Sequence, residues 1–226
     1  MNVLVIAAHP DDEVLGMGGT IKKYTKNKHN VKIVIMATGI FARRSQNGKN
    51  STTYNVDEQS IAIMEKKLDE LRCNAKKATK ILGVTDLELL DFPDNEMDKV
   101  SNLEITKKIE SIIEKFKPTV VFTHTQHDIN IDHRIIYNAT VTATRPTPGS
   151  IVKKVFSFEV PSSTEWYFPS QFSPNVFVDI KAELPVKIKA LSAYKHEIRR
   201  FPHPRSTKAI DVIAKKWGTV CGFDAA

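Results

Sequence analysis

One histidine and three carboxylates lie close together near the amino end of the sequence. They belong to the segment AHPDDE, residues 8–13, which follows directly on the apolar run 2–8. Pro10 restricts the preceding His9 to an extended conformation and cannot continue a strand, so the chain must turn at this point. Carboxylates in such a turn can cap the free N–H groups of a following helix. Capping explains one aspartate, but a histidine beside two adjacent aspartates in a half-buried turn indicates a bound cation.

The segment HTQHDINIDHR, residues 124–134, has the same form. An apolar run at 119–124 leads into histidines and carboxylates before a helical pattern begins. The carboxyl ends of neighbouring parallel strands meet at one edge of a sheet, so the two segments are expected to lie together. One histidine and one aspartate from the first segment, with one histidine from the second, would form a three-ligand site. Catalytic zinc uses three protein ligands and keeps a further position open for water.

Hydrophobic periodicity predicts the elements that position these two segments. Short apolar runs alternate with helical patterns, each long enough for a crossover between parallel strands. The alternation predicts an α/β fold with a Rossmann-like, mostly parallel, doubly wound sheet flanked by helices. The predicted strands are residues 2–8, 31–38, 87–92, 119–124, 154–160 and 176–180. The predicted helices lie near 16–28, 57–82, 102–116, 131–143, 181–197 and 206–217.

Composition bounds the class of protein. An apolar fraction of 41% in 226 residues favours a single domain, residues 1–226, with a sizeable core. No apolar run reaches the roughly 18 residues of a membrane span, and no signal-peptide pattern is present, so a cytoplasmic protein without a membrane span is expected. The net charge of +7 is spread over stretches that interleave bases with acids, which is typical of a solvated surface. No nucleic-acid-binding motif accompanies it.

The polar segment 43–55 is too poor in apolar residues to form part of the core. Loops of this length in compact domains are usually functional or disordered. If the segment covers the site, Arg43 and Arg44 are candidates for contact with the substrate.

Four stretches of the sequence resemble the LmbE-like (PIG-L) family of zinc-dependent N-acetylglucosaminyl de-N-acetylases. The resemblance extends over nearly the whole chain. The stretches are AHPDDE at 8–13 with Gly16, Gly18 and Gly19 behind it, FPDN at 92–95, Asp132-His133-Arg134, and AYKHEIRRFPHPRS at 193–206. The glycines lack the spacing of a nucleotide-binding loop and favour close packing of a helix on the sheet.

The resemblance implies roles for individual residues. By it, His9, Asp12 and His133 are the metal ligands, and Asp11 is a general base that does not bind the metal. Asp94 is implied to contact a sugar hydroxyl. One Zn²⁺ per chain is expected, and Fe²⁺ or Co²⁺ would also suit such a donor set.

Asp132 has two interpretations from the residues alone. It can be an acidic residue at the start of a helix, or a carboxylate that orients a metal-bound histidine.

One position departs from the family pattern. Many family members carry a histidine three residues before the second metal histidine, where it is placed to stabilise an oxyanion, but this chain has Asn130. Asn130, His127 and His203 are the candidates for that role. His203 is favoured because prolines stiffen the segment FPHPRS and Arg205 can anchor it to an acid or to a substrate anion.

The resemblance implies hydrolysis of the N-acetyl amide of an acetamido sugar, which releases acetate and an amino sugar. The basic composition and the arginine pair favour an anionic, nucleotide-linked or otherwise conjugated sugar. Two other functions stay open at this point: a phosphoester hydrolase, which would usually gather ligands for two metals, and a non-catalytic carbohydrate-binding protein. A homo-oligomer is compatible with the sequence.

Overall fold

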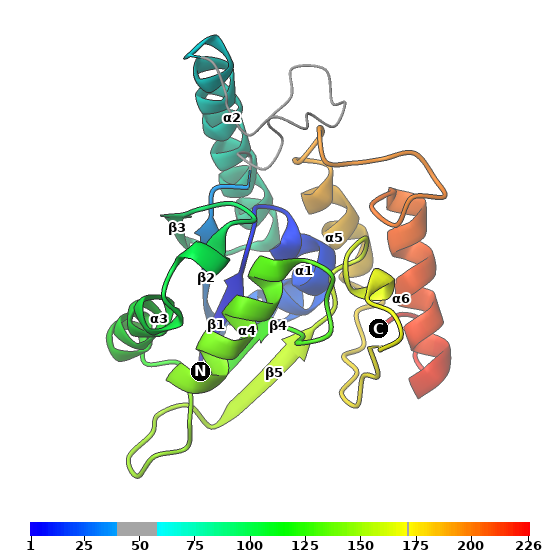
Figure 1. Ribbon diagram of the computed structural model, residues 1–226. Helices are drawn as coiled ribbons and strands as arrows, with labels where there is room; N and C mark the ends of the chain where they lie inside the picture. The colour runs from blue at the N-terminus through cyan, green and yellow to red at the C-terminus, as the bar shows by residue number, and fades with distance from the viewer. Residues whose placement is uncertain (40–57, 171) are drawn as a thin grey trace.

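Five parallel strands form one sheet at the centre of the described chain (Figure 1). The computed structural model describes residues 1–39, 58–170 and 172–226. The strand order is β3-β2-β1-β4-β5. The strands are β1 (Asn2–Ala7), β2 (Asn30–Ala37), β3 (Asp86–Phe92), β4 (Val120–His124) and β5 (Lys154–Phe158).

Helices cover both faces of the sheet, because successive residues of a strand point to opposite faces. In β1, Val3 and Val5 pack in a cluster with α1, α2 and α5, whereas Leu4 and Ile6 pack in a second cluster with α3 and α4. The helices are α1 (Asp12–Lys26), α2 (Glu58–Leu82), α3 (Asn102–Phe116), α4 (Ile131–Ala143), α5 (Leu184–Leu191) and α6 (Thr207–Cys221). Two short 3₁₀ helices span Met97–Lys99 and Thr164–Trp166.

The strand order reverses at β1. The chain moves from β1 to β2 on one side, whereas β4 pairs with β1 on the other side, with Val3 opposite Val120 and Val5 opposite Phe122. Parallel sheets of this kind bind ligands where the strand order reverses. The segments that follow β1 and β4 are therefore brought together at this switch point.

The predicted α/β fold and parallel sheet are confirmed, but one predicted strand is wrong. Residues 176–180 form no strand: Ile180 instead donates its backbone N–H to the carbonyl of Ala225 at 3.0 Å. Helix α1 begins at Asp12 rather than near residue 16, so this aspartate lies in the first helical turn. Helix α5 ends at Leu191, earlier than its apolar pattern predicts.

Gly16 allows α1 to lie close to β5. A Cβ at this position would lie 2.5 Å from Cδ2 of Phe158 and 2.6 Å from the carbonyl oxygen of Glu159. Close packing of helix on sheet is thus the role of this glycine. None of the helices in the described ranges is long and apolar enough to cross a membrane.

Candidate metal and catalytic site

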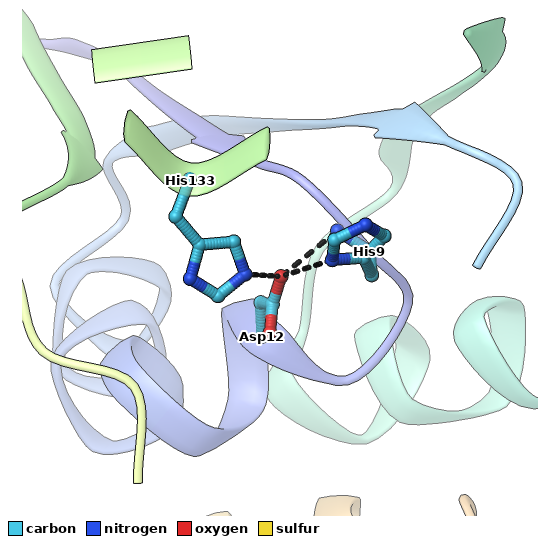
Figure 2. Close-up of side chains that lie close together, drawn as sticks. All are labelled: His9, Asp12 and His133. Carbon is cyan, nitrogen blue, oxygen red and sulfur yellow. Dashed lines mark hydrogen bonds and ion pairs between the residues drawn. The ribbon is translucent and has the colours of Figure 1, made fainter. Parts of the chain in front are cut away.

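Three buried side chains converge at the switch point: His9 after β1, Asp12 in the first turn of α1, and His133 in the first turn of α4 (Figure 2). The Oδ2 atom of Asp12 lies 3.1 Å from Nε2 of His133 and 3.4 Å from Nδ1 of His9. The same oxygen accepts the backbone N–H of His9 at 2.9 Å. One potential ligand atom from each residue lies within 4.8 Å of the others.

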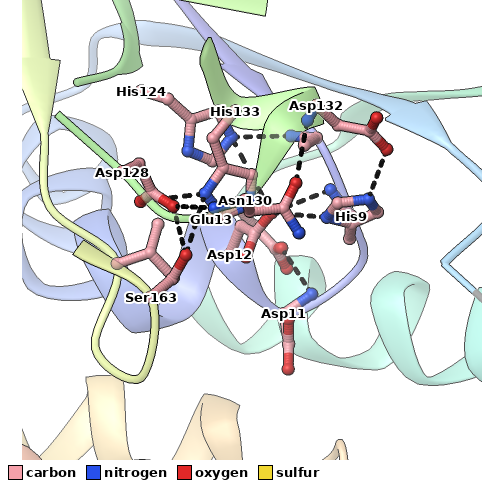
Figure 3. A network of polar contacts seen from close by, with 12 residues as sticks. His9, Asp11, Asp12, Glu13, His124, Asp128, Asn130, Asp132, His133 and Ser163 are labelled. Carbon is pink, nitrogen blue, oxygen red and sulfur yellow. Dashed lines mark hydrogen bonds and ion pairs between the residues drawn. The ribbon is translucent and has the colours of Figure 1, made fainter. Parts of the chain in front are cut away.

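A carboxylate lies against the outer nitrogen of each histidine (Figure 3). Nε2 of His9 is 3.0 Å from Oδ2 of Asp132 and 3.2 Å from Oδ1 of Asp94. Nδ1 of His133 is 3.0 Å from Oδ2 of Asp128. Because each outer nitrogen donates to a carboxylate, the inner nitrogens, Nδ1 of His9 and Nε2 of His133, can present lone pairs toward Asp12. Carboxylate–histidine pairs of this kind orient metal-binding imidazoles in proteins.

An orphaned buried atom supports a cation at this position. Nε2 of His133 is buried and has no hydrogen-bond partner of acceptable geometry, although Asp12 lies close to it. Buried polar atoms are rarely left unsatisfied. Two imidazole nitrogens and one carboxylate oxygen are a donor set that suits zinc. The residues present therefore fit a divalent metal.

Asp132 belongs to a second possible group of ligands, with His9 and Asp94. Its carboxylate already accepts the backbone N–H groups of Asn95 at 2.7 Å and Met97 at 3.2 Å. These contacts hold Asp132 against His9. The group that contains the orphaned His133 nitrogen is the better metal site.

The protonation states of His9, Asp12 and His133 indicate which positive charges a bound cation would replace. Burial lowers the pKa of His133, but Asp12 and Asp128 outweigh it and raise the pKa to about 9. Burial likewise opposes protonation of His9, yet its carboxylate partners raise the pKa well above its usual value. Burial raises the pKa of Asp12, but both histidines hold it well below its ordinary range. Two imidazolium groups thus balance the buried carboxylate when no metal is bound.

Asp11 lies beside this cluster but points away from Asp12 (Figure 3). Its backbone has a φ of 108°, a left-handed conformation that costs a residue with a side chain about 1–3 kcal/mol. Oδ2 of Asp11 accepts a bond from Nη1 of Arg205 at 2.9 Å. Burial raises the pKa of Asp11, Arg205 opposes it, and nearby carboxylates add to it, so that the pKa reaches about 8.

Arg205 connects the segment after α5 to the site. Besides Asp11, it contacts Oε2 of Glu197 at 3.2 Å and the hydroxyl of Ser162 at 2.6 Å. His203 is half-buried, and its Nδ1 accepts the backbone N–H of Arg205 at 3.1 Å. Its ring meets that of Trp166 edge to face, with centroids 6.0 Å apart. His203 is therefore held next to the arginine that binds Asp11.

The other predicted site residues have different surroundings. Asn130 is the N-cap of α4: its side chain accepts the N–H of Asp132 and donates to Oδ1 of Asn95, both at 2.9 Å. His127 is half-buried and lies 3.0 Å from the side-chain nitrogen of Gln126. Asp94 is buried against His9. The predicted substrate contacts at 43 and 44 lie outside the described residues.

Two functional contacts were not predicted from the sequence. Asp128 was not among the predicted site residues, yet it holds His133 and also accepts from Thr164 at 2.9 Å and from Ser163. His124 stacks on His133 with ring centroids 3.9 Å apart, and its Nε2 accepts the N–H of Ala8 at 2.8 Å. The spacing of Asp128 five residues before His133, across the start of α4, is the signal that could have identified the first of these contacts.

Glu13 forms a third unpredicted contact, behind the site. Its carboxylate accepts the hydroxyl of Tyr194 at 2.6 Å and the backbone N–H of Asp11 at 3.0 Å. Both side chains are fully buried. This pair supports the strained turn on which Asp11 is presented.

Comparison with known proteins shows which family of sequences this chain resembles. The sequence model of the PIG-L family, described as GlcNAc-PI de-N-acetylase, matches residues 4–144. A protein of Bacillus anthracis named a probable N-acetyl-alpha-D-glucosaminyl L-malate deacetylase 2 is 26% identical over 194 residues, which cover 85% of this chain and 80% of that protein. The diacetylchitobiose deacetylase of Thermococcus kodakarensis is 28% identical and matches 86% of this chain and 69% of its own length.

A solved structure shares the fold. The N,N'-diacetylchitobiose deacetylase of Pyrococcus horikoshii, in complex with an inhibitor, superposes with a TM-score of 0.74 at 21% identity. The superposition covers 99% of this chain and 80% of that one. The parallel sheet and its helices therefore have the arrangement found in that structure.

Proposed function

The chain belongs to the PIG-L family, and from this premise we propose that it is a zinc-dependent hydrolase that removes the N-acetyl group of an acetamido sugar. The products are acetate and the free amino sugar. The observation that carries the proposal is the convergence of His9, Asp12 and His133 beside the Asp11 carboxyl, which Arg205 holds.

His9, Asp12 and His133 would hold the metal. When bound, the ion supplies Lewis acidity, which polarises the amide carbonyl and activates water as a nucleophile at neutral pH. Asp132 and Asp128 orient the two imidazoles through their outer nitrogens. The protein thus contributes a fixed donor set whose ring orientations are set before substrate binds.

Asp11 is the proposed general base. Its neighbour Asp12 faces the histidines, whereas the Asp11 side chain is directed elsewhere and is free of the ligand set. The charge of a bound cation would favour the ionised form of Asp11 over the neutral acid. The carboxylate would then take a proton from the attacking water and return it to the amine as the C–N bond breaks. Arg205 keeps the carboxylate in place, since one of its nitrogens lies 2.9 Å from Oδ2.

His203 is the proposed donor to the oxyanion. Burial lowers its pKa, and Arg205 and Arg199 lower it further, so the ring is neutral at pH 7. Because Nδ1 accepts the N–H of Arg205, the proton lies on Nε2, which can donate to a developing negative charge. The side chain of Asn130 already caps α4 and binds Asn95. This favours His203 over Asn130 as the donor to the oxyanion.

The substrate class follows from the relatives. Two of them are named for N-acetylglucosaminyl malate and for diacetylchitobiose, both of which carry an acetamido sugar. An anionic conjugate suits a chain with a net charge of +7. Asp94 and Arg205 are the proposed contacts to the sugar and its conjugate among the described residues.

Acetate release tests the proposal. Protein stripped with a chelator and protein reloaded with zinc would be incubated with free N-acetylglucosamine, diacetylchitobiose, N-acetylglucosaminyl malate and a nucleotide-linked N-acetylhexosamine. We expect at least one sugar to yield acetate and amine in equal amounts, only with the reloaded protein. Hydrolysis of p-nitrophenyl phosphate without acetate release from any sugar would favour a phosphoester hydrolase instead. Sugar binding without either reaction would indicate a carbohydrate-binding protein.

A further inference from the structure

A cavity of about 280 Å³ lies against the edge strand β5, apart from the metal cluster. Residues of α1, α5 and α6 and of the segment 172–178 complete its walls. His9, Asp12 and His133 are not among the residues that line it. Six aromatic side chains form much of the lining: Phe122, Phe156, Phe158, Phe172, Phe177 and Trp217.

One buried amine lines this cavity without a partner. Lys187 of α5 is 8% exposed, and its stem lies against Gly18 of α1, where a Cβ would come within 2.9 Å of the lysine Cγ. Its ammonium group has no hydrogen bond or ion pair with any residue in the described ranges. Burial lowers the pKa of Lys187 to about 8, and the charge of Glu159 offsets only part of this effect.

Glu159 also lines the cavity, and its charge acts on the lysine without a direct contact. Its Oε1 accepts the indole N–H of Trp217, and it forms no ion pair with Lys187. Burial raises the pKa of Glu159, which favours the neutral acid. The cavity thus offers a cation, a hydrogen-bonding acid and an apolar wall. This combination is complementary to an anion that carries a hydrocarbon group.

We propose that this cavity binds a small monocarboxylate with an apolar tail, with the carboxylate on Lys187 and the tail among the aromatic side chains. The volume corresponds to roughly nine water molecules, so a ligand of about ten non-hydrogen atoms fills it. Ligand sites in proteins typically combine such an apolar lining with a few polar groups that fix orientation. Octanoate has the required size and charge.

The two tryptophans of the chain make binding measurable. Trp166 lies outside the cavity lining and Trp217 within it, so Trp166→Phe leaves one fluorophore that reports on the cavity. In this background we expect octanoate to change the fluorescence of Trp217 in a saturable way. Octan-1-ol, which has the same tail and no charge, should bind about 10- to 100-fold more weakly, as expected for loss of a charge-assisted hydrogen bond.

Two lysine variants separate the proposed contact from a general effect. Lys187→Met keeps the length of the side chain and should weaken octanoate binding by the same 10- to 100-fold while leaving octan-1-ol unchanged. Lys189→Met, on the exposed side of the same helix, should alter neither. His133→Ala should also leave octanoate binding intact, because the metal cluster does not line the cavity.

Four results would overturn the proposal. The first is the absence of any saturable response of Trp217 to octanoate. The second is equal binding of octanoate by the wild-type protein and Lys187→Met, and the third is equal binding of octanoate and octan-1-ol. The fourth is loss of octanoate binding in His133→Ala with retention in Lys187→Met, which would place the carboxylate at the metal cluster.

Discussion

Asp128 Oδ2 lies 3.0 Å from Nδ1 of His133, and this contact sets which nitrogen of the ring faces Asp12. In the neutral ring, which a bound metal requires, the donated Nδ1–H leaves Nε2 as the nitrogen with a free lone pair. That atom is buried, lies 3.1 Å from Oδ2 of Asp12 and has no hydrogen-bond partner of its own. The orientation of a potential metal ligand thus depends on a residue that is not itself in the ligand set.

Asp128→Asn is expected to weaken metal binding about 10- to 100-fold, because the amide supports the imidazole less strongly than the carboxylate does. Competition with a chelator of known affinity would measure the change. Asp98→Asn, on an exposed position, is the matched control and should leave the affinity unaltered. An unaltered affinity in Asp128→Asn, with the fold intact by circular dichroism, would contradict an orienting role.

The backbone conformation of Asp11 predicts that glycine at this position is more stabilising than alanine, the reverse of the usual order. With a φ of 108°, Asp11→Gly should be more stable than Asp11→Ala by about 1 kcal/mol, because glycine adopts this conformation without strain. At Lys22, in the interior of the helix α1 that follows, glycine should instead be less stable than alanine by about 1 kcal/mol. Urea unfolding of the four variants gives the comparison. The same order at both positions would argue against strain at Asp11.

Lys187 predicts a dependence of stability on pH. Burial lowers its pKa from 10.5 to about 8, so between these values the unfolded chain holds a proton that the folded protein lacks. The free energy of unfolding of the wild-type protein should therefore rise, relative to Lys187→Met, as the pH increases from 8 to 10.5. At pH 7 the variant should be the more stable protein, by up to about 3 kcal/mol.

The measurement is denaturant unfolding of the wild-type protein, Lys187→Met and Lys189→Met between pH 7 and 10.5. Lys189 is exposed, so its replacement should produce a difference that does not change with pH. A pH-independent difference for Lys187→Met as well would show that its amine is not buried as a charge.

The centre of the sheet could be predicted because β1, β2 and β4 are short, mainly apolar runs, as expected for strands covered on both faces. The run VFVDI at 176–180 has the same composition but forms no strand. Its side chains pack near the carboxyl end of the chain and around the cavity, with Ile180 in a cluster with Leu184 and Ala214. Tertiary packing determined the conformation of residues 176–180, and no local sequence pattern indicates this packing.

The potential metal ligands could be predicted because they lie in two short segments of the sequence. The histidines and aspartates follow two strands, and a parallel sheet brings those strand ends together. The pairing of Asp128 with His133 depends on the local turn before α4, whereas the bond of Arg205 to Asp11 depends on how separate loops meet. A residue in a turn and a residue in a distant segment have no common pattern in the sequence, so the contact between Arg205 and Asp11 could not be derived from it.

His203→Ala should lower turnover about 10²–10³-fold without loss of metal, as expected when one donor to an oxyanion is removed. His196→Ala is the control, since this histidine lies on the same segment with its side chain 75% exposed and paired with Glu70. Asn130→Ala and His127→Ala would be measured in parallel. Near-normal turnover in His203→Ala, with a large loss in one of the other two, would assign the role to the segment after β4.

The pair Asp11→Asn and Asp12→Asn tests the central claim most directly, with metal content and acetate release measured on the same samples. We predict that Asp11→Asn keeps one metal per chain but loses about 10²–10⁴-fold in turnover, because an amide cannot accept a proton from water. Asp12→Asn should lose the metal, and Asp211→Asn, on α6 and paired with Lys215, should lose neither. Equal loss of metal in both variants, or full turnover in Asp11→Asn, would contradict the division of the two adjacent aspartates into base and ligand.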